Sequence, residues 1–434
     1  MEREKITGQV EISSLTTASI KQDVKNVNSL AAKIEEFVSA SATDLLAAIL
    51  GGAIVLNSSD IHLEPEEKKS QLRMRIDGVL HDVIEFDLKT YRAILSRIKL
   101  LANLKINVAD RPQDGRFTIL MEKTIIEIRV STLPAEQGES IVLRTLNPAN
   151  LIGMEDLGLR KDLVAIFDRE IKRPNGMIIV TGPTGSGKTT TLYAVLKKIN
   201  NPGIKIITIE DPIEYHLDGL SQTQVDPKKG YTFASGLKSI MRQDPDVILV
   251  GEIRDLETSE IACQAALTGH LVFSTLHTND AAGAIARLVD LGVRTISIAP
   301  AITMVVAQRL PRKVCRKCVE MVTPSKEEME KLRKNLIGIK REILPESFFQ
   351  PDFKIAKAKG CPDCNNTGYR GRIGIYETLL VDDEIERFIL TSPSIIDMKE
   401  LAIKKGMITM QQDGLMKVAE GITTIEEIER VAGE

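Results

Sequence analysis

The run from Gly182 to Thr189 carries the clearest chemical signal in the chain. It reads G-P-T-G-S-G-K-T and fits the pattern G-x-x-x-x-G-K-[ST] at every fixed position. An apolar, strand-like stretch (MIIVT) precedes it, and a helical pattern (TTTLYAVLKKI) follows. In this context backbone N–H groups can surround a phosphate, and the start of a helix adds positive partial charge. The sequence therefore predicts a nucleotide-binding loop made of Gly182, Pro183, Thr184, Gly185, Ser186, Gly187, Lys188, Thr189 and Thr190.

Acidic residues follow two neighbouring strand-like runs, at the edge where a parallel sheet presents its ligands. Glu210 and Asp211 end the run 204–211, and Glu252 ends the run 246–252. We expect Glu252 to polarise the attacking water, because it comes directly after a strand. Gly251 stands where many phosphate-loop ATPases carry an aspartate. Magnesium is therefore expected to be bound by the Thr189 hydroxyl and water, while Lys188 reaches the β- and γ-phosphates.

Histidine is scarce in this chain, with five in all. His270 and His277 bracket the apolar run LVFSTL, so both could lie at an edge of the sheet. From their spacing alone, a structural and a functional role are both open.

Four of the five cysteines form two C-x-x-C pairs, which are Cys315 with Cys318 and Cys361 with Cys364. Four thiolates in two pairs fit a structural tetrahedral Zn²⁺ site with no open position for catalysis. Redox-active pairs or unmetallated thiols are the alternatives. Cys263, among apolar neighbours, is expected to be a buried structural thiol.

The pattern along the chain predicts an α/β protein with several parts. We expect an N-terminal arm or linker over 1–45, a small α+β domain over 46–150 and a nucleotide-binding domain over 151–434. The last part includes a zinc module over 312–372 and a helical tail over 373–434. Within 151–312, four apolar β-rich runs alternate with helical patterns, as in a buried parallel sheet with crossover helices. Asp77-Gly78, between two alternating runs, predicts a β-hairpin.

Composition narrows the class of protein. The 434 residues include 43% hydrophobic and 27% charged residues, which is ordinary for a globular protein and excludes a disordered chain. The apolar run 45–56 is too short to span a bilayer, and the N-terminus has no secretory signal. We therefore expect a soluble cytosolic protein. With a net charge of −3, no tryptophan and 4% aromatic residues, nucleic acid is not an expected partner.

Four runs in order, GPTGSGKTTTLYA, TIEDPIEYH, RQDPDVILVGEIRD and TGHLVFSTLHTND, resemble the Walker A, Asp box, Walker B and His box of the secretion ATPases. These motors drive type II secretion and type IV pilus assembly. The resemblance also covers SSDIHLEP, RPQDGRF, RVSTLPAEQGES, AQRLPRKVCRKC and GCPDCNNTGYRGRIGIYE, so it spans about residues 50–430. It implies a RecA-like P-loop NTPase core, a preceding small α+β domain and a tetracysteine zinc module.

The same resemblance implies roles for the candidate site residues. Lys188 and Thr189 would bind ATP and Mg²⁺, Glu252 would be the catalytic glutamate, and Glu210 would support the metal and water. His277, together with His270, would sense the γ-phosphate. Arg116 and Arg129 match arginines that the N-terminal domain offers to bound nucleotide.

The resemblance further implies a homo-hexameric ring at the inner face of the cytoplasmic membrane, acting on an inner-membrane platform protein. A nucleic-acid translocase or helicase is the alternative from another class, since RecA-like ATPases share the phosphate loop. Type II secretion, type IV pilus extension and DNA-uptake pseudopilus assembly share these motifs, so the choice among the three systems stays open. Longer family members carry an additional N-terminal domain, whereas about 45 residues precede the shared region in this sequence.

Overall fold

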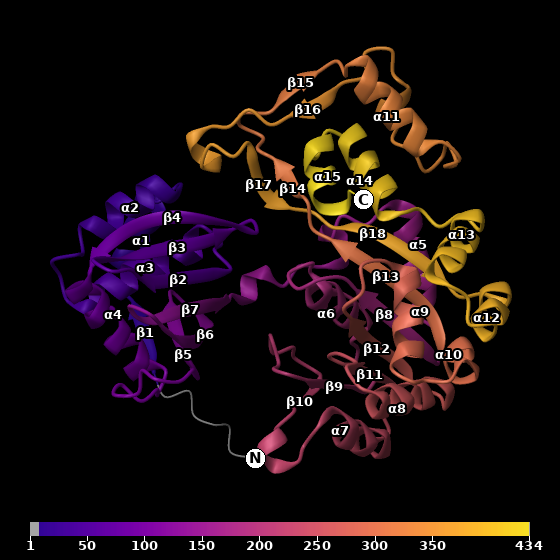
Figure 1. Cartoon of the computed structure of the whole chain (residues 1–434), viewed down its shortest axis with the longest axis horizontal. Coiled ribbons are helices and arrows are strands. Elements are labelled where there is room, and N and C mark those ends of the chain that lie inside the picture. The colour runs from indigo at the N-terminus through magenta and orange to yellow at the C-terminus, as the bar shows by residue number, and fades with distance from the viewer. Residues whose placement is uncertain (1–7, 434) are drawn as a thin grey trace. The chain divides into compact units, whose positions relative to one another are not determined.

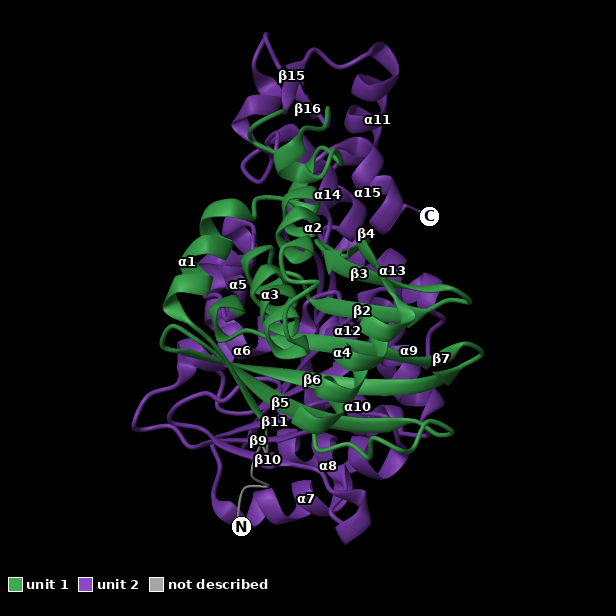
Figure 2. Ribbon diagram, turned by 90° about the vertical axis from the view of Figure 1, so that its left-hand side faces the viewer, with its two compact units in different colours: residues 1–150, 315–318, 359–370 green, residues 151–314, 319–358, 371–434 purple. Residues whose placement is uncertain are grey.

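The computed structural model describes residues 8–433, which form two compact units (Figure 2). Among the described residues, unit 1 comprises 8–150, 315–318 and 359–370. Unit 2 comprises 151–314, 319–358 and 371–433. Within residues 8–433, none of the helices is both long and apolar enough to cross a membrane.

Unit 1 is built on a seven-stranded sheet in the order β1-β5-β6-β7-β2-β3-β4. Its elements, labelled in Figure 1, are β1 (Gln9–Ile12), α1 (Ser14–Asp23), α2 (Val27–Glu35), α3 (Ala42–Val55), β2 (Asp60–Pro65), β3 (Lys69–Ile76), β4 (Val79–Asp87), α4 (Leu88–Leu101), β5 (Gln113–Met121), β6 (Thr124–Ala135) and β7 (Gly138–Leu146). Successive side chains along each strand point to opposite faces of the sheet. One set packs with the helices in the core, and the other set lies on the opposite face. Asp77 and Gly78, with φ of 50° and 82°, form the predicted two-residue hairpin turn between β3 and β4.

The expectation of an arm or linker over 1–45 is wrong for the described part of that segment. β1 adds a parallel strand beside β5, and α1 and α2 bury Ile20 and Leu30 completely in the core of unit 1. Helices α2 and α3 pack closely against each other, because a Cβ atom at Gly52 of α3 would collide with the Leu30 side chain of α2. The sequence did not predict that this segment packs in the core, because α1 and α2 each contribute only a few apolar residues.

Unit 2 is built on a second seven-stranded sheet in the order β10-β9-β11-β12-β8-β13-β18, parallel except for β18. Its first part contains α5 (Lys161–Glu170), β8 (Gly176–Thr181), α6 (Lys188–Ile199), β9 (Ile206–Glu210), β10 (Ser221–Gln224), α7 (Phe233–Ile240), β11 (Val247–Val250), α8 (Leu256–Leu267), β12 (Leu271–Leu276), α9 (Ala281–Asp290), α10 (Thr295–Ala301) and β13 (Ile302–Arg309). Strands β8, β9, β11 and β12 confirm the four apolar runs as buried parallel strands. Helices cover both faces: Ile178 and Val180 face α5 and α6, while Met177 and Ile179 face the core with α7–α10.

The C-terminal third differs from the expected helical tail over 373–434. Its elements are β14 (Arg312–Val314), β15 (Glu320–Val322), α11 (Lys326–Leu336), β16 (Ile355–Lys357), β17 (Tyr369–Arg372), β18 (Ile375–Leu380), α12 (Asp383–Leu390), α13 (Ile395–Lys404), α14 (Met410–Ala419) and α15 (Ile425–Ala432). The segment opens with β18, which pairs with β13 and completes the sheet before the helices begin. The apolar, alternating sequence IGIYETLL was the signal for this strand.

The expected zinc module over 312–372 does not form one part of the structure. Its two C-x-x-C segments group with unit 1, whereas β15, α11 and β16 belong to unit 2. The Asn365 side chain, in the second cysteine segment, accepts a hydrogen bond from the Val27 N–H group at the start of α2. The helix N-terminus leaves such N–H groups without intrahelical partners, so this bond satisfies one of them.

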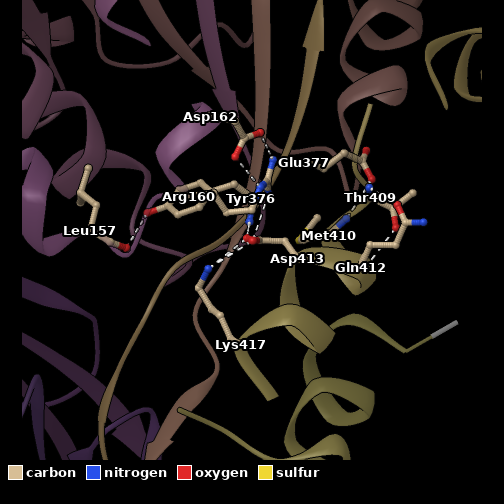
Figure 3. Close-up of polar contacts among 10 residues, drawn as sticks. All are labelled: Leu157, Arg160, Asp162, Tyr376, Glu377, Thr409, Met410, Gln412, Asp413 and Lys417. Carbon is tan, nitrogen blue, oxygen red and sulfur yellow. Dashed lines mark hydrogen bonds and ion pairs between the residues drawn. The ribbon is translucent and has the colours of Figure 1, made fainter. Parts of the chain in front are cut away.

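A buried polar cluster fixes the C-terminal helices to the rest of unit 2 (Figure 3). The fully buried Asp413 carboxylate accepts the backbone N–H of Tyr376 at 2.7 Å and forms ion pairs with Arg160 at 3.0 Å and Lys417 at 3.2 Å. The Tyr376 hydroxyl in turn donates to the Leu157 carbonyl at 3.0 Å. One carboxylate on α14 therefore joins β18 to the segment that leads into α5.

We expect Asp413→Ala to destabilise unit 2 by about 3–5 kcal/mol, because the change leaves two buried cations without their shared anion. Denaturant unfolding of the variant and the parent chain measures this difference. Asp162→Ala is the matched control, since Asp162 pairs with the same Arg160 but is 30% exposed. Equal stability losses in the two variants would contradict the central position of Asp413.

A second prediction concerns pH. Burial alone raises the pKa of Glu427, but hydrogen bonds from Arg430 and Arg312 outweigh it and lower that pKa to about 2. Because the pKa is lower in the folded than in the unfolded state, the stabilisation is present above the unfolded pKa of about 4.5 and lost as the pH falls towards 2. The free energy of unfolding, measured from pH 6 to pH 2, should therefore fall less steeply in Glu427→Gln than in the parent chain. An equal pH dependence in the two proteins would contradict this role of Glu427.

Candidate active site and metal centre

The phosphate loop joins the end of β8 to the start of α6. Gly182, Gly185 and Gly187 have φ of 146°, 80° and 89°, a backbone region that side chains disfavour. Gly187 is the residue that caps the N-terminus of α6, so the free N–H groups of the first turn face the loop. This geometry supplies the ring of backbone donors that the sequence pattern predicts.

The loop also holds Lys188 folded back onto its own backbone. The Lys188 Nζ atom donates to the carbonyl oxygens of Gly182 at 2.8 Å and Pro183 at 3.1 Å, and the residue is 8% exposed. Burial lowers the pKa of Lys188, and the charge of Glu252 opposes that shift. The Ser186 hydroxyl is buried and has no hydrogen-bond partner within residues 8–433. A buried ammonium beside an unsatisfied hydroxyl fits an anionic phosphate.

Glu252 and His277 meet at the same edge of the sheet. The Glu252 carboxylate, 13% exposed, lies 2.5 Å from Arg254 Nη2 and 3.6 Å from His277 Nε2. Burial lowers the pKa of His277, the charge of Lys188 lowers it further, and Glu252 acts in the opposite direction. The structure thus brings Lys188, Glu252 and His277 together and favours a neutral imidazole at pH 7.

Glu210 lies in a different environment at the end of β9. Its carboxylate is 4% exposed and accepts hydrogen bonds from the Tyr193 hydroxyl, from Thr208 at 2.5 Å and from Gln222 at 3.4 Å. Burial raises the pKa of Glu210, while these three donors act in the opposite direction. Glu210 is therefore engaged by protein donors in this state, and a role on a metal or water requires release of some of these bonds.

The geometry does not support His270 as part of a γ-phosphate sensor. His270 precedes β12 and His277 follows it, so the extended strand separates them by about 23 Å at ~3.3 Å per residue. His270 Nδ1 lies 3.1 Å from the Ala265 carbonyl oxygen, at the amino end of the sheet. Nucleotides bind at the carboxyl end of parallel strands, where His277 lies.

The two predicted arginines lie in unit 1. Arg116 on β5 and Arg129 on β6 are direct cross-strand partners, so both side chains stand on one face of the sheet. That face is opposite the helices, because the neighbouring Phe117 and Ile128 are fully buried in the core with α1–α4.

The four paired cysteines form a cluster that could hold a metal ion. Their sulfur atoms all lie within 4.8 Å of one another, with Cys315 to Cys361 at 4.0 Å, Cys318 to Cys364 at 3.8 Å and Cys361 to Cys364 at 3.7 Å. A tetrahedral ion with ~2.3 Å bonds to sulfur requires sulfur separations of ~3.8 Å. The donor set therefore fits a four-thiolate site. Cys263 stays apart and buried, which raises its pKa to about 12.

Two residues at the nucleotide site were not singled out from the sequence. Arg254 pairs with Glu252, and Gln308 on β13 accepts a hydrogen bond from Thr191 of α6 at 2.7 Å. The Gln308 side chain also lies against Gly187, where a Cβ atom would come within 2.8 Å of Nε2. Arg254 is close to Glu252 in sequence and could have been noticed, whereas Gln308 is remote from the loop and gave no local signal.

Comparison with known proteins defines the class. Residues 35–430 match the family model described as type II/IV secretion system protein. The chain is 44% identical over 422 residues to type II secretion system protein E of Pseudomonas aeruginosa, covering 97% of this chain and 81% of that protein. It is 41% identical over 426 residues to type IV pilus assembly ATPase PilB of Thermus thermophilus, covering 98% of this chain and 46% of that protein.

Solved structures agree with this match. The pilus retraction motor PilT with bound ADP aligns with a TM-score of 0.59 at 28% identity, covering 88% of this chain and 95% of that one. The ATPase DotB of Legionella pneumophila aligns with a TM-score of 0.64 at 22% identity, covering 89% and 95%, which shows a shared fold. The fold and site are those of a P-loop ATPase with a RecA-like core. This chain belongs to the type II/IV secretion ATPase family, whose members include type II secretion and type IV pilus assembly ATPases.

We expect Lys188→Ala to weaken ATP binding by about 10- to 100-fold, since a hydrogen bond to a charged group contributes about 1.5–3 kcal/mol. Equilibrium titration with a fluorescent ATP analogue measures the change. Lys198→Ala is the control, because Lys198 lies on the same helix but pairs with Asp168 at the surface. An unchanged ATP affinity in Lys188→Ala would contradict a role of this lysine in nucleotide binding.

Proposed function

We propose that this chain hydrolyses ATP to drive assembly of type IV pilus or type II secretion pseudopilus subunits through an inner-membrane platform protein. The observation that carries the proposal is the grouping of Lys188, Glu252 and His277 beside the phosphate loop. The relatives named as secretion and pilus assembly ATPases supply the biological process. We further propose a homo-hexamer that works at the inner face of the cytoplasmic membrane.

In this proposal the loop from Gly182 to Thr190 binds the phosphates of ATP. Lys188 exchanges its two backbone acceptors for phosphate oxygens. The Thr189 hydroxyl would hold Mg²⁺, which would supply positive charge next to the phosphates. Glu252 orients and deprotonates the attacking water, with Arg254 fixing one of its oxygens. His277, as a neutral imidazole, donates to the γ-phosphate.

The remaining predicted residues have supporting roles. Glu210 would act on the metal and water after leaving some of its donors, among them Thr208 and Gln222. Arg116 and Arg129 would place guanidinium groups on phosphate oxygens, where they stabilise charge in the transition state.

We propose Zn²⁺ for the tetracysteine cluster, held by Cys315, Cys318, Cys361 and Cys364. Four thiolates leave no open coordination position, so the ion would be structural. Backbone N–H groups of Cys361 and Gly368 lie 3.2 and 3.3 Å from the Cys364 sulfur, which stabilises thiolate character there.

Among related functions, the relatives favour secretion and pilus assembly over a nucleic-acid translocase. The names of the similar proteins cover both type II secretion and type IV pilus assembly, at comparable identity. A DNA-uptake pseudopilus motor remains a third system of the same mechanical kind.

Glu252→Gln tests the proposed chemistry. We expect normal ATP affinity and a loss of at least 100-fold in turnover, because the amide cannot accept the proton of the attacking water. Phosphate release and nucleotide titration separate the two effects. Glu257→Gln, an exposed glutamate paired with Lys238, is the control. Undiminished hydrolysis in Glu252→Gln would overturn the assignment.

Metal removal tests the zinc proposal. The purified chain should contain about one Zn²⁺ per polypeptide, measured by metal analysis, and Cys361→Ser should lower that content. Cys263→Ser, at the unpaired cysteine, should leave it unchanged. Protease cleavage near the two cysteine segments should increase after chelation, and resistance equal to that of the untreated protein would contradict a structural metal.

A further inference from the structure

A buried carboxylate in unit 2 lies at the start of two helices. Glu377 on β18 is 2% exposed, and its Oε1 atom accepts the backbone N–H of Ala281 at 3.0 Å. Its Oε2 atom accepts the backbone N–H of Met410 at 3.4 Å (Figure 3). These two donors belong to the first residues of α9 and α14. Negative charge is favourable at a helix N-terminus, where N–H groups lack partners within the helix, so Glu377 fixes the start of both helices.

The cross-strand register places Glu377 in line with the end of β8. Glu377 pairs with Ala307 on β13, and Ala307 pairs with Thr181 on β8. Paired residues point to the same face of a sheet, and Ala307 packs in the core with α7–α10. Thr181 is the last residue of β8 and directly precedes the phosphate loop. Glu377 and Thr181 are therefore two polar side chains on the α9 face of the sheet, two strands apart.

The segment that follows β12 is held at both ends by these two side chains. Next to His277, the Thr278 N–H donates to the Thr181 hydroxyl at 2.8 Å. At the other end, Ala281 is bound by Glu377. The strands that carry the two anchors are two spacings, or about 10 Å, apart. The three residue steps from Thr278 to Ala281 also reach at most about 10 Å, so the segment has little slack and the position of His277 depends on both anchors.

The carboxylate form of Glu377 matters for both contacts. Burial raises the pKa of Glu377, and the N–H groups of Ala281 and Met410 act in the opposite direction. A carboxylate offers an acceptor to each N–H group, whereas an amide offers one acceptor and places its NH₂ group against the other donor. A buried donor without an acceptor is costly, so an amide at this position cannot hold both helices equally well.

We propose that Glu377 is a positioning residue of the ATPase site. It acts through His277, because it fixes the start of α9 and with it the segment that holds the imidazole beside Glu252. The inference deepens the proposed function and rests on it, since the role of His277 at the γ-phosphate belongs to that proposal. Glu377 lies two strands from the phosphate loop, so its loss should lower turnover more than ATP affinity.

The experiment is a double-mutant cycle on ATP hydrolysis by the full chain. Glu377→Gln should lower kcat by about 10-fold and leave the ATP affinity, measured by equilibrium titration, within about threefold of the parent chain. In a His277→Ala background the same change should lower kcat by less than about twofold, because no imidazole is left to position. Asp382→Asn is the matched control, since Asp382 caps the N-terminus of α12 by accepting the Ile385 N–H at 3.1 Å. Its kcat should stay within about twofold of the parent value.

Melting temperatures without nucleotide show whether each variant folds. If Glu377→Gln does not fold, Glu377→Asp replaces it in the cycle, because it keeps the charge on a shorter side chain; it should lower kcat in the same direction by a smaller factor.

The outcomes separate the inference from the function beneath it. Equal losses from the Glu377 change in both backgrounds would show that Glu377 acts on the fold alone, and would overturn the inference. If His277→Ala impairs hydrolysis while Glu377→Gln leaves kcat unchanged, the inference is wrong and the proposed function stands. If His277→Ala hydrolyses ATP as fast as the parent chain, the proposed role of His277 fails, and the inference fails with it.

Discussion

The nucleotide site depends on backbone N–H groups at the start of α6 being held at the carboxyl edge of a parallel sheet. Three glycines at positive φ make the loop that turns those donors inward, and no other residue type adopts these angles without strain. Once the loop is formed, Lys188 has no better acceptors than the loop's own carbonyls until a phosphate arrives. The sheet, its two helical layers and the buried Asp413 cluster keep this edge in place.

Two carboxylates at this edge of the sheet, those of Glu252 and Glu210, lie in different environments. Glu252 stays partly open and faces a lysine, an arginine and a histidine, so its charge is compensated and available for chemistry. Glu210 is buried among hydroxyl and amide donors, and burial raises its pKa. Two glutamates with similar sequence positions after neighbouring strands therefore have different local electrostatics. This difference favours Glu252 as the base and makes any role of Glu210 conditional on a rearrangement of its donors.

Local sequence determined which features could be predicted. The phosphate loop, the buried strands and the hairpin at Asp77-Gly78 each depend on residues close in sequence, and the structure contains all of them. The burial of apolar side chains within residues 8–41, the pairing of β18 and the grouping of the cysteines with unit 1 depend on partners far along the chain. His270 shows the same limit, because strand direction, not nearness in sequence to His277, decides which end meets the nucleotide. The shared face of Arg116 and Arg129 in unit 1 can be recognised only from the cross-strand register.

The proposed function requires that the phosphate loop and Glu252 form a magnesium-dependent ATPase site. The most direct test is phosphate release from ATP by the purified full chain, measured with and without Mg²⁺ over a range of protein concentrations that covers assembly. We expect saturable phosphate release that requires Mg²⁺. Tight ATP binding without phosphate release at any protein concentration, or hydrolysis that is indifferent to Mg²⁺, would contradict it.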